Sequence, residues 1–325
     1  MRYLDAAQHA RLVPDADYFE LVDRAWCIYG KEREVLSVPS IAAISPPQAP
    51  RMAIKGAMAS ALGVHGIFFG AQSQEYTFAV CEFATGRPIG LMEQSAAYRK
   101  RTAAQGVVAA RYFAPRGARV AAVIGSGGIA SHVVRMLPLE FQLDELRLAS
   151  RTATGARAFV ERLQPEVGAP MRACDSIAEA VRDADFVITI SSAAEPFLGA
   201  GMLRRGAFLC SLGGGHEIDA SILAEVDRLF VDDLSYALWR GDFKGWVDRG
   251  DISRAALEQR IEGDIGLVAL GELPRRQADE TIMAVIQGTA ICDLVVAHAA
   301  LERAALAGVG TVLANTYPGA GAGRS

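Results

Sequence analysis

The stretch from residue 119 to residue 130 constrains the fold of this chain more than any other. Residues 119–124 read Arg-Val-Ala-Ala-Val-Ile, an apolar run typical of a central parallel strand. The loop Gly125-Ser126-Gly127-Gly128-Ile129-Ala130 follows at once and opens a predicted helix from about Ile129 to Leu137. A glycine loop in this position, between a buried strand and a helix, is typical of a dinucleotide-binding βαβ unit.

Each part of the loop has a physical task in such a unit. Gly125 permits the tight turn, Gly127 lets the backbone approach a pyrophosphate, and Ala130 lets the helix pack closely on the sheet. The helix N-terminus offers N–H groups and a positive dipole end to the phosphates. The loop therefore predicts a nicotinamide dinucleotide site; the alternative is a strand–helix turn that binds no ligand.

Strand and helix patterns alternate in the residues that follow. A helix is predicted from about Thr152 to Leu163, and the buried-strand candidates are residues 145–149, 185–190, 207–212 and 228–231. This alternation predicts an α/β fold with a Rossmann-type, doubly wound parallel sheet. A last helix is expected from Glu280 to about Ala307, and the glycine-rich tail 318–325 is expected to be disordered.

The first hundred residues have a different pattern. An amphipathic helix is predicted over 15–30 and an alanine-rich helix over 95–114, with Pro115 ending the second. Short strands separated by turn signals are predicted around residues 38–44, 51–55, 66–70, 76–83 and 88–93. They predict an α+β domain with an antiparallel sheet. We place this discontinuous domain at residues 1–116 with 281–325, and the dinucleotide-binding domain at 117–280.

Composition narrows the class of protein. Half of the residues are apolar and the net charge is −4, which predicts a globular chain without a nucleic-acid-binding surface. We expect no membrane segment, no signal peptide, no metal site and reduced cysteines, hence a cytoplasmic protein. Only four of the 33 basic residues are lysines. A lysine at the end of an apolar strand, such as Lys55, is therefore notable, although most single lysines are surface charges.

The end of the second predicted strand bears on the choice of cofactor. An acidic residue there would bind the ribose 2′-hydroxyl of NAD. This chain has Ser150-Arg151-Thr152 instead, with no carboxylate to repel a 2′-phosphate. Arg151 can pair with such a phosphate, so we expect NADP to be preferred over NAD. The alternative is that Arg151 stacks on the adenine or faces solvent.

Several motifs in order resemble the ornithine cyclodeaminase/mu-crystallin family. The quartet Arg101-Thr102-Ala103-Ala104 lies in a helix that feeds the strand before the glycine loop. Further matching segments, spread with it over roughly 250 residues, are Thr85–Glu93, Ala184–Thr189 with Glu195-Pro196, Arg205–Phe208, Val231–Asp233, Gly271–Arg276 with Glu280-Thr281, and Gly288–Asp293. Each match is modest, but their common order makes the resemblance specific.

The resemblance implies a homodimer that binds a small amino-acid or imino-acid substrate. It implies that the discontinuous domain binds substrate and forms the dimer contact. Lys55 stands at the position of the family's substrate lysine, and Arg101 at that of the arginine that holds the substrate carboxylate. The residues expected to contact the cofactor are Thr102, Gly125, Ser126, Gly127, Gly128, Ile129, Ala130, Ser150, Arg151, Thr152, Ser191 and Gly213.

The chain also departs from the family pattern. The aspartate that serves the cyclodeaminases as a base falls at Gly215, in a shortened loop. His216, Glu217 or Asp219 could replace it, and His216 is the preferred catalytic candidate because histidine is the residue type whose ordinary pKa lies near neutrality. Further family positions are altered as well: an arginine falls at Ile41, a threonine at Tyr98 and a serine at Gln287.

Three functions follow from this pattern. The first is an NAD(P)H-dependent reductase of a ketimine or cyclic imino acid, working reversibly as an amino-acid dehydrogenase. This reaction needs orientation and a cation more than a dedicated carboxylate base, so it tolerates glycine at position 215. The second is cyclodeamination of ornithine to proline with release of ammonia. The third is NADPH-dependent binding of a small ligand without turnover. The departures from the family pattern favour the reductase.

Overall fold

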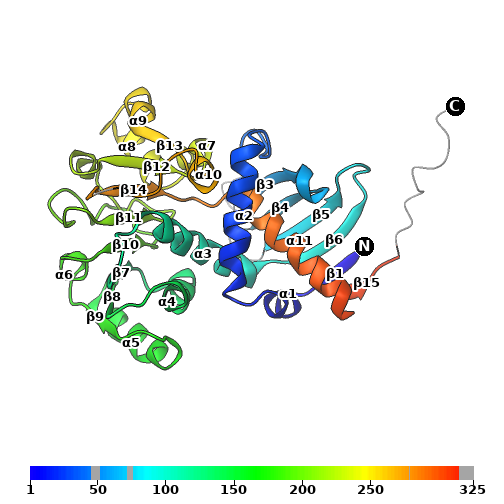
Figure 1. Cartoon of the computed structure of the whole chain (residues 1–325), viewed down its shortest axis with the longest axis horizontal. Coiled ribbons are helices and arrows are strands. Elements are labelled where there is room, and N and C mark those ends of the chain that lie inside the picture. Colours follow the sequence, from blue (N-terminus) through cyan, green and yellow to red (C-terminus); the bar gives the residue numbers. More distant parts are fainter. Residues whose placement is uncertain (45–51, 72–75, 278, 315–325) are drawn as a thin grey trace. The chain divides into compact units, whose positions relative to one another are not determined.

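The chain forms two compact units, seen in a computed structural model that describes residues 1–44, 52–71, 76–277 and 279–314 (Figure 1). Unit 1 comprises Met1–Arg101 and Thr289–Ser325, and unit 2 comprises Thr102–Gly288. The tail at 318–325, which we expected to be disordered, lies outside the described residues. Each unit is built on its own sheet.

The core of unit 2 is an eight-stranded, wholly parallel sheet. Its strands are β7 (Val120–Ile124), β8 (Glu145–Ala149), β9 (Met171–Ala173), β10 (Phe186–Thr189), β11 (Phe208–Ser211), β12 (Arg228–Val231), β13 (Ile261–Asp264) and β14 (Ile282–Val285). They lie in the order β13-β12-β14-β11-β10-β7-β8-β9. The strand order reverses between β7 and β10, and ligands of such sheets bind outside the carboxyl ends of the strands at this point. The predicted Rossmann-type fold is confirmed.

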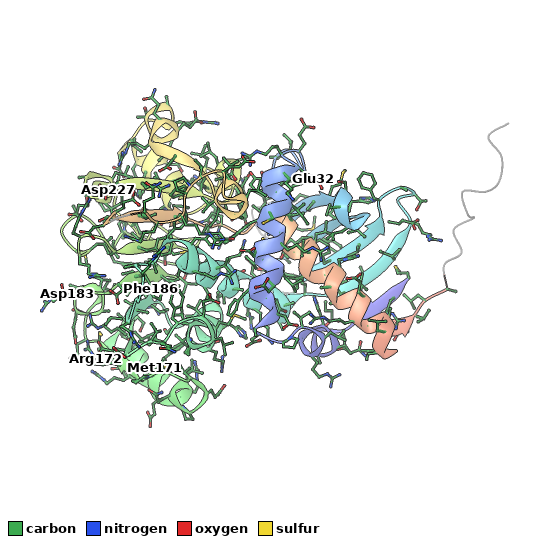
Figure 2. The ribbon with its side chains drawn as sticks, viewed as in Figure 1. Glu32, Met171, Arg172, Asp183, Phe186 and Asp227 are labelled. Carbon is green, nitrogen blue, oxygen red and sulfur yellow. The ribbon has the colours of Figure 1, made fainter. Side chains whose placement is uncertain are left out.

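Helices connect these strands. They are the second half of α3 (Ser95–Phe113), then α4 (Gly128–Glu140), α5 (Ala153–Leu163), α6 (Ile177–Val181), α7 (Leu234–Ala237), α8 (Asp242–Arg249), α9 (Arg254–Arg260) and α10 (Ile265–Leu270). Short 3-10 turns lie at Gln164–Glu166 and Ala220–Ala224. Figure 2 shows Phe186 inside this unit and Asp183 at its edge; the Phe186 ring centroid lies 4.9 Å from that of Phe141.

One predicted element is wrong. The helix expected from Glu280 to Ala307 begins only at Ala290, and residues 282–285 form β14 between β11 and β12. All four residues of β14 are fully buried. A short apolar run fits a buried strand as well as a buried helix, so periodicity alone does not distinguish them. Gly288, with φ +93°, separates the strand from the helix.

Unit 1 contains a seven-stranded sheet. Its strands are β1 (Arg2–Leu4), β2 (Ala42–Ile44), β3 (Met52–Ala59), β4 (Val64–Ala71), β5 (Tyr76–Glu82), β6 (Pro88–Glu93) and β15 (Thr311–Val312), in the order β15-β1-β6-β5-β4-β3-β2. The pairings are antiparallel except that of β1 with β6, so the sheet is mixed rather than purely antiparallel as expected. A 3-10 turn at Ser60–Leu62 joins β3 to β4.

The helix α11 (Ala290–Ala307) covers one face of this sheet (Figure 1). Its approach is close because two strand glycines face it. A Cβ on Gly66 would lie 3.0 Å from Leu294, and one on Gly90 would overlap Leu301. The helices α1 (Ala6–Leu12) and α2 (Asp17–Lys31) also pack against α11. None of the helices in the described residues is long and apolar enough to span a membrane.

Candidate functional site

The glycine loop of unit 2 has a backbone that only glycine adopts without strain. Gly125 has φ +137°, and its N–H donates to the Ala149 carbonyl at 2.9 Å. A Cβ at Gly125 would overlap the backbone oxygen of Ile190. The turn after β7 therefore lies directly against the residue that follows β10. These are the two strands at which the strand order reverses.

The N-terminus of α4 fits a pyrophosphate. The helix begins at Gly128 with Gly127 as its N-cap, and no side chain in the described part of the chain caps it. A Cβ on Gly127 would meet no atom within 4 Å, so there is open space at this point. Ala130, in the first turn of α4, is fully buried. Open space beside N–H groups of a helix N-terminus suits a bound phosphate.

The segment after β8 contains the residues expected to choose the cofactor. The Thr152 hydroxyl accepts from Gly155 N–H at 3.1 Å and so caps α5, while the Ser150 hydroxyl donates to the Thr152 carbonyl at 3.0 Å. Arg151 is exposed, and it makes no hydrogen bond or ion pair with any residue that the structure describes. Its guanidinium is thus available for a phosphate.

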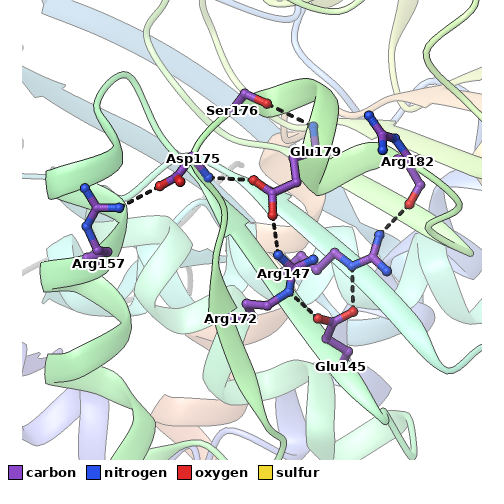
Figure 3. Close-up of polar contacts among 8 residues, drawn as sticks. All are labelled: Glu145, Arg147, Arg157, Arg172, Asp175, Ser176, Glu179 and Arg182. Carbon is purple, nitrogen blue, oxygen red and sulfur yellow. Dashed lines mark hydrogen bonds and ion pairs between the residues drawn. The ribbon is translucent and has the colours of Figure 1, made fainter.

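Arginines on β8, β9 and α5 are already paired (Figure 3). Arg147 donates to Glu145 at 2.6 Å, and Arg157 donates to Asp175 at 2.6 Å. Arg172 pairs with both Glu145 and Glu179, a carboxylate that in turn accepts from Asp175 N–H at 2.9 Å. This network ties β8, β9, α5 and α6 together at the surface, and Arg151 takes no part in it.

The segment after β10 is held by a buried carboxylate. Glu217 is fully buried, and its Oε2 accepts from the Thr189 hydroxyl at 2.8 Å. Its other oxygen accepts from the Ser191 N–H. Ser191 was expected to contact the cofactor, and Glu217 therefore sets the backbone of this part of the expected site.

A second buried carboxylate supports the first. Asp242, the first residue of α8, accepts from Glu217 N–H at 2.7 Å and from the Ser211 hydroxyl at 2.6 Å. Burial, and then the charge of Asp242, raises the pKa of Glu217 to about 7. Burial raises the pKa of Asp242 as well. This pair couples the ends of β10 and β11 through side chains that sequence analysis did not connect.

These shifts predict a pH dependence of stability. The pKa of Glu217 is raised in the folded state, so its contribution to the free energy of unfolding is fully present below about pH 4.5 and is lost as the pH rises through about 7. In Glu217→Gln the side chain is neutral at every pH, so this part of the pH dependence should be absent. The measurement is urea unfolding at fixed protein concentration. Between pH 4.5 and pH 8, we expect the free energy of unfolding of the variant to rise by about 3 kcal/mol relative to that of the wild type. A constant difference would contradict the assignment. Burial also raises the pKa of Asp242, and that of Asp232 to about 6, but both of these groups are present in the two proteins.

The loop after β11 accounts for the glycine at the family's aspartate position. A Cβ on Gly215 would overlap the backbone of Ala193. A Cβ on Gly213 would overlap the Glu217 carboxylate, and one on Gly214 would overlap the Arg240 guanidinium. Gly213, expected to contact the cofactor, thus also makes room for Glu217. No carboxylate side chain fits at Gly215 in this loop.

The three candidates to replace that carboxylate have distinct surroundings. The Glu217 carboxylate is bound to Thr189 and Ser191, as described above. Asp219 caps the following 3-10 turn, accepting from Ser221 N–H at 2.9 Å. The ring of His216 packs against α8, where Gly245 leaves room for it. The carboxylates of Glu217 and Asp219 therefore already accept hydrogen bonds within unit 2.

Unit 1 brings together the two cations expected to bind substrate. Lys55 Nζ lies 3.2 Å from Asp293 Oδ2, while Arg101 Nε and Nη2 lie 2.8 and 2.7 Å from Asp293 Oδ1. All three side chains are at most 2% exposed. Burial alone would lower the pKa of Arg101, but the Asp293 carboxylate raises it overall. One carboxylate thus balances part of the charge of two buried cations, an arrangement that costs desolvation and is unusual in a core.

Three aromatic rings adjoin this charged group. Lys55 Nζ lies 4.5 Å from the ring centroid of Phe68, its partner across β3 and β4. Arg101 Cζ lies 4.7 Å from the ring centroid of Tyr98, one turn earlier on α3. Tyr76 contacts both rings, with centroids 4.9 Å from Phe68 and 4.6 Å from Tyr98. The cations are therefore bounded by aromatic faces as well as by Asp293.

Sequence reasoning did not single out Asp293 as a site residue. It lay inside the Gly288–Asp293 motif, but Lys55 and Asp293 are separated by 238 positions. A signal was present, because an aspartate in the first turn of the strongly apolar helix α11 needs a buried partner. Thr102, the next residue after Arg101, is buried at 5% exposure on α3.

Known proteins resemble this chain in sequence and in fold. The Δ1-pyrroline-2-carboxylate reductase of Bacillus cereus is 28% identical over 70% of this chain and 71% of its own length. The ketimine reductase mu-crystallin of Rattus norvegicus is 28% identical over 66% of this chain and 64% of its own. The Δ1-pyrroline-2-carboxylate reductase of Thermococcus litoralis, solved with NADH and L-proline, is 21% identical and has the same fold (TM-score 0.87, covering 96% of this chain and 100% of that one).

A family model matches most of the chain. The model of the ornithine cyclodeaminase/mu-crystallin family matches residues 67–307, about three quarters of the chain. The match runs from β4 of unit 1, through the whole of unit 2, to the end of α11. It therefore includes Arg101, the glycine loop and Asp293. This chain belongs to the ornithine cyclodeaminase/mu-crystallin family.

Proposed function

We propose that this protein is an NAD(P)H-dependent reductase of a ketimine or cyclic imino acid. The observation that carries the proposal is the buried group of Lys55, Arg101 and Asp293. Two cations joined by one carboxylate suit an α-imino acid, which presents a carboxylate and a basic nitrogen on adjacent atoms. The names of the relatives in Bacillus cereus and Rattus norvegicus support the same reaction class.

The chain's own residues would bind and protonate the substrate. Asp293 occupies the Nε and Nη2 edge of Arg101 and so orients the other edge, which we assign to the substrate carboxylate. Lys55 would donate a hydrogen bond to the imine nitrogen. A bound nicotinamide would supply the hydride for the imine carbon. As the C=N electron pair moved to nitrogen, that nitrogen would take its proton from the Lys55 ammonium.

The loop at Gly215 separates this proposal from cyclodeamination. A cyclodeaminase must deprotonate and hold a second amine, a task for a carboxylate at that position. The loop leaves no space for a side chain there, and Glu217 and Asp219 are bound elsewhere in unit 2. We keep His216, whose ring packs against Gly245 of α8, as the candidate for a second proton-transfer group.

A turnover assay tests the function. The wild-type protein is incubated with NADPH or NADH and a panel that includes Δ1-pyrroline-2-carboxylate and Δ1-piperideine-2-carboxylate, and absorbance of the reduced nicotinamide is followed. Net oxidation that depends on the imine is the expected result. Ammonia released from ornithine without net change in cofactor would establish cyclodeamination instead. Tight NADPH binding with neither reaction would favour a binding protein.

We propose that NADP is preferred over NAD because Arg151 is exposed and without a partner among the described residues. In Arg151→Asp, a charge-assisted contact to the 2′-phosphate is replaced by repulsion. Such contacts contribute about 1.5–3 kcal/mol, so the ratio of kcat/KM for NADPH to that for NADH should fall about tenfold or more. Arg157→Asp is the matched control, since Arg157 already pairs with Asp175. An unchanged ratio in Arg151→Asp would refute the preference.

We further propose that the protein is a homodimer joined through unit 1. On the sheet face opposite α11, the large apolar side chains Met58, Ile67 and Phe69 are 43, 43 and 37% exposed. Neighbouring exposed apolar groups of this kind mark protein interfaces. Light scattering after gel filtration should give a dimer mass for the wild type and a monomer mass for Ile67→Glu. Leu306→Glu, at a 90% exposed position of α11, should remain dimeric; a wild-type monomer would refute the proposal.

A further inference from the structure

Three aromatic rings form one continuous cluster beside the cations of unit 1. Phe68 on β4, Tyr76 on β5 and Tyr98 on α3 lie with ring centroids 4.6–5.8 Å apart. The sheet register explains why: Phe68 and Gly70 point to the same face, and Gly70 pairs with Tyr76. Phe68 is 2% exposed, whereas Tyr76 and Tyr98 are half-buried.

These rings take up specific positions around the charged group. Lys55 Nζ lies 4.5 Å from the Phe68 centroid and 5.8 Å from that of Tyr98. Arg101 Cζ lies 4.7 Å from the Tyr98 centroid. Tyr98 thus adjoins both cations. It also stands where the family pattern has the much smaller threonine, so a substrate held by the cations must fit beside a full aromatic ring.

The aromatic cluster of Phe68, Tyr76 and Tyr98 favours a substrate whose side chain or ring carries no charge. The face of an aromatic ring carries negative charge density, which attracts cations and repels carboxylates. A second carboxylate on the substrate would meet ring faces instead of donors. A distal ammonium would be placed near Lys55 and Arg101, whose charges already occupy the faces of Phe68 and Tyr98. An apolar side chain or ring of the substrate can pack against these aromatic rings without an electrostatic cost.

We propose that Tyr98, backed by Phe68 and Tyr76, is a specificity-determining residue that restricts the substrate to α-imino acids with a short, uncharged side chain or ring. This inference rests on the proposed reductase function and narrows its substrate class. It excludes imines that carry a second carboxylate or a distal cation. Tyr98 acts by direct contact with the substrate body, while Phe68 and Tyr76 hold its ring in place.

The test compares imines that differ only in the side chain. Methylamine is mixed with pyruvate, with oxaloacetate or with 2-oxo-5-guanidinovalerate, giving a short, an anionic and a cationic imine; Δ1-pyrroline-2-carboxylate is the cyclic member. For the wild type we expect kcat/KM to be at least about tenfold higher for the pyruvate and pyrroline imines than for either charged imine. Comparable values for a charged imine would overturn the inference.

Two variants locate the selectivity. Tyr98→Thr removes the ring and should bring the ratio of uncharged to charged kcat/KM toward one. Tyr98→Phe keeps the ring and should leave the ratio near that of the wild type. A wild-type ratio in an active Tyr98→Thr would show that Tyr98 does not select. The wild-type comparison stands even if a variant does not fold. Absence of turnover with every imine would overturn the reductase function, and this inference with it, whereas turnover without selectivity overturns the inference alone.

Discussion

Replacing Lys55 by alanine should reduce kcat for imine reduction by at least about 100-fold, the usual loss when a positioned proton donor is removed. The Kd for NADPH should stay nearly unchanged, because the expected cofactor contacts lie in unit 2. The protein should also remain folded. Removal of Lys55 leaves Arg101 and Asp293 as a balanced pair with contacts of 2.7 and 2.8 Å. The measurements are steady-state kinetics and a titration of NADPH by fluorescence.

Two further variants separate chemistry from packing at this position. Lys55→Met keeps an unbranched apolar stem beside Phe68 but has no ammonium, so it should lose activity as Lys55→Ala does. Lys244→Met changes a partly exposed lysine that pairs with Asp248 on its own helix, and it should retain full activity. If Lys55→Met turned over imines at the wild-type rate, Lys55 would have no role in proton transfer.

Replacing Asp293 by asparagine should have the largest effect on stability. The change keeps the shape of the side chain but leaves Lys55 and Arg101 as two buried cations without this counter-charge. Removing one partner of a buried ion pair costs about 3–5 kcal/mol, a large share of the stability of a typical protein. Urea unfolding monitored by circular dichroism should show this loss, and imine reduction should fall as Arg101 loses its orientation.

The double variant Asp293→Asn with Lys55→Met provides a sharper test. It removes one cation together with the carboxylate, so it should recover part of the stability that Asp293→Asn loses. Glu258→Gln is the matched surface control, because Glu258 pairs with Arg254 at 2.8 Å in an exposed position; such pairs contribute little. Equal stability of Asp293→Asn and the wild type would contradict the account of this buried group.

Local sequence was sufficient to predict the strand, the turn and the helix around the glycine loop of unit 2. The strand, the turn and the helix around Gly125 are consecutive, so their residue types alone predict both the fold and the position of the loop. The strand β8 and the exposed Arg151 after it follow from the same short-range pattern. These features depend on backbone conformation and hydrophobic periodicity, which a single sequence carries.

The remaining features depend on contacts between distant residues. Asp293 meets Lys55 and Arg101 only because α11 returns from the end of the chain to cover the sheet of unit 1. Glu217 and Asp242 likewise meet through the ends of β10 and β11. The strand β14 was mistaken for part of a helix because its apolar run has no periodicity to separate the two. Pairing and packing, rather than local propensity, decide these cases.

The most direct test of the central claim is a crystal structure of the protein with NADPH and the amino acid that it forms, for example L-proline. The account predicts that the product carboxylate lies within hydrogen-bond distance of the Arg101 guanidinium and its nitrogen within such a distance of Lys55 Nζ. Asp293 should remain bound to both cations. A product carboxylate bound by other residues, with Lys55 and Arg101 contacting only Asp293, would contradict the account.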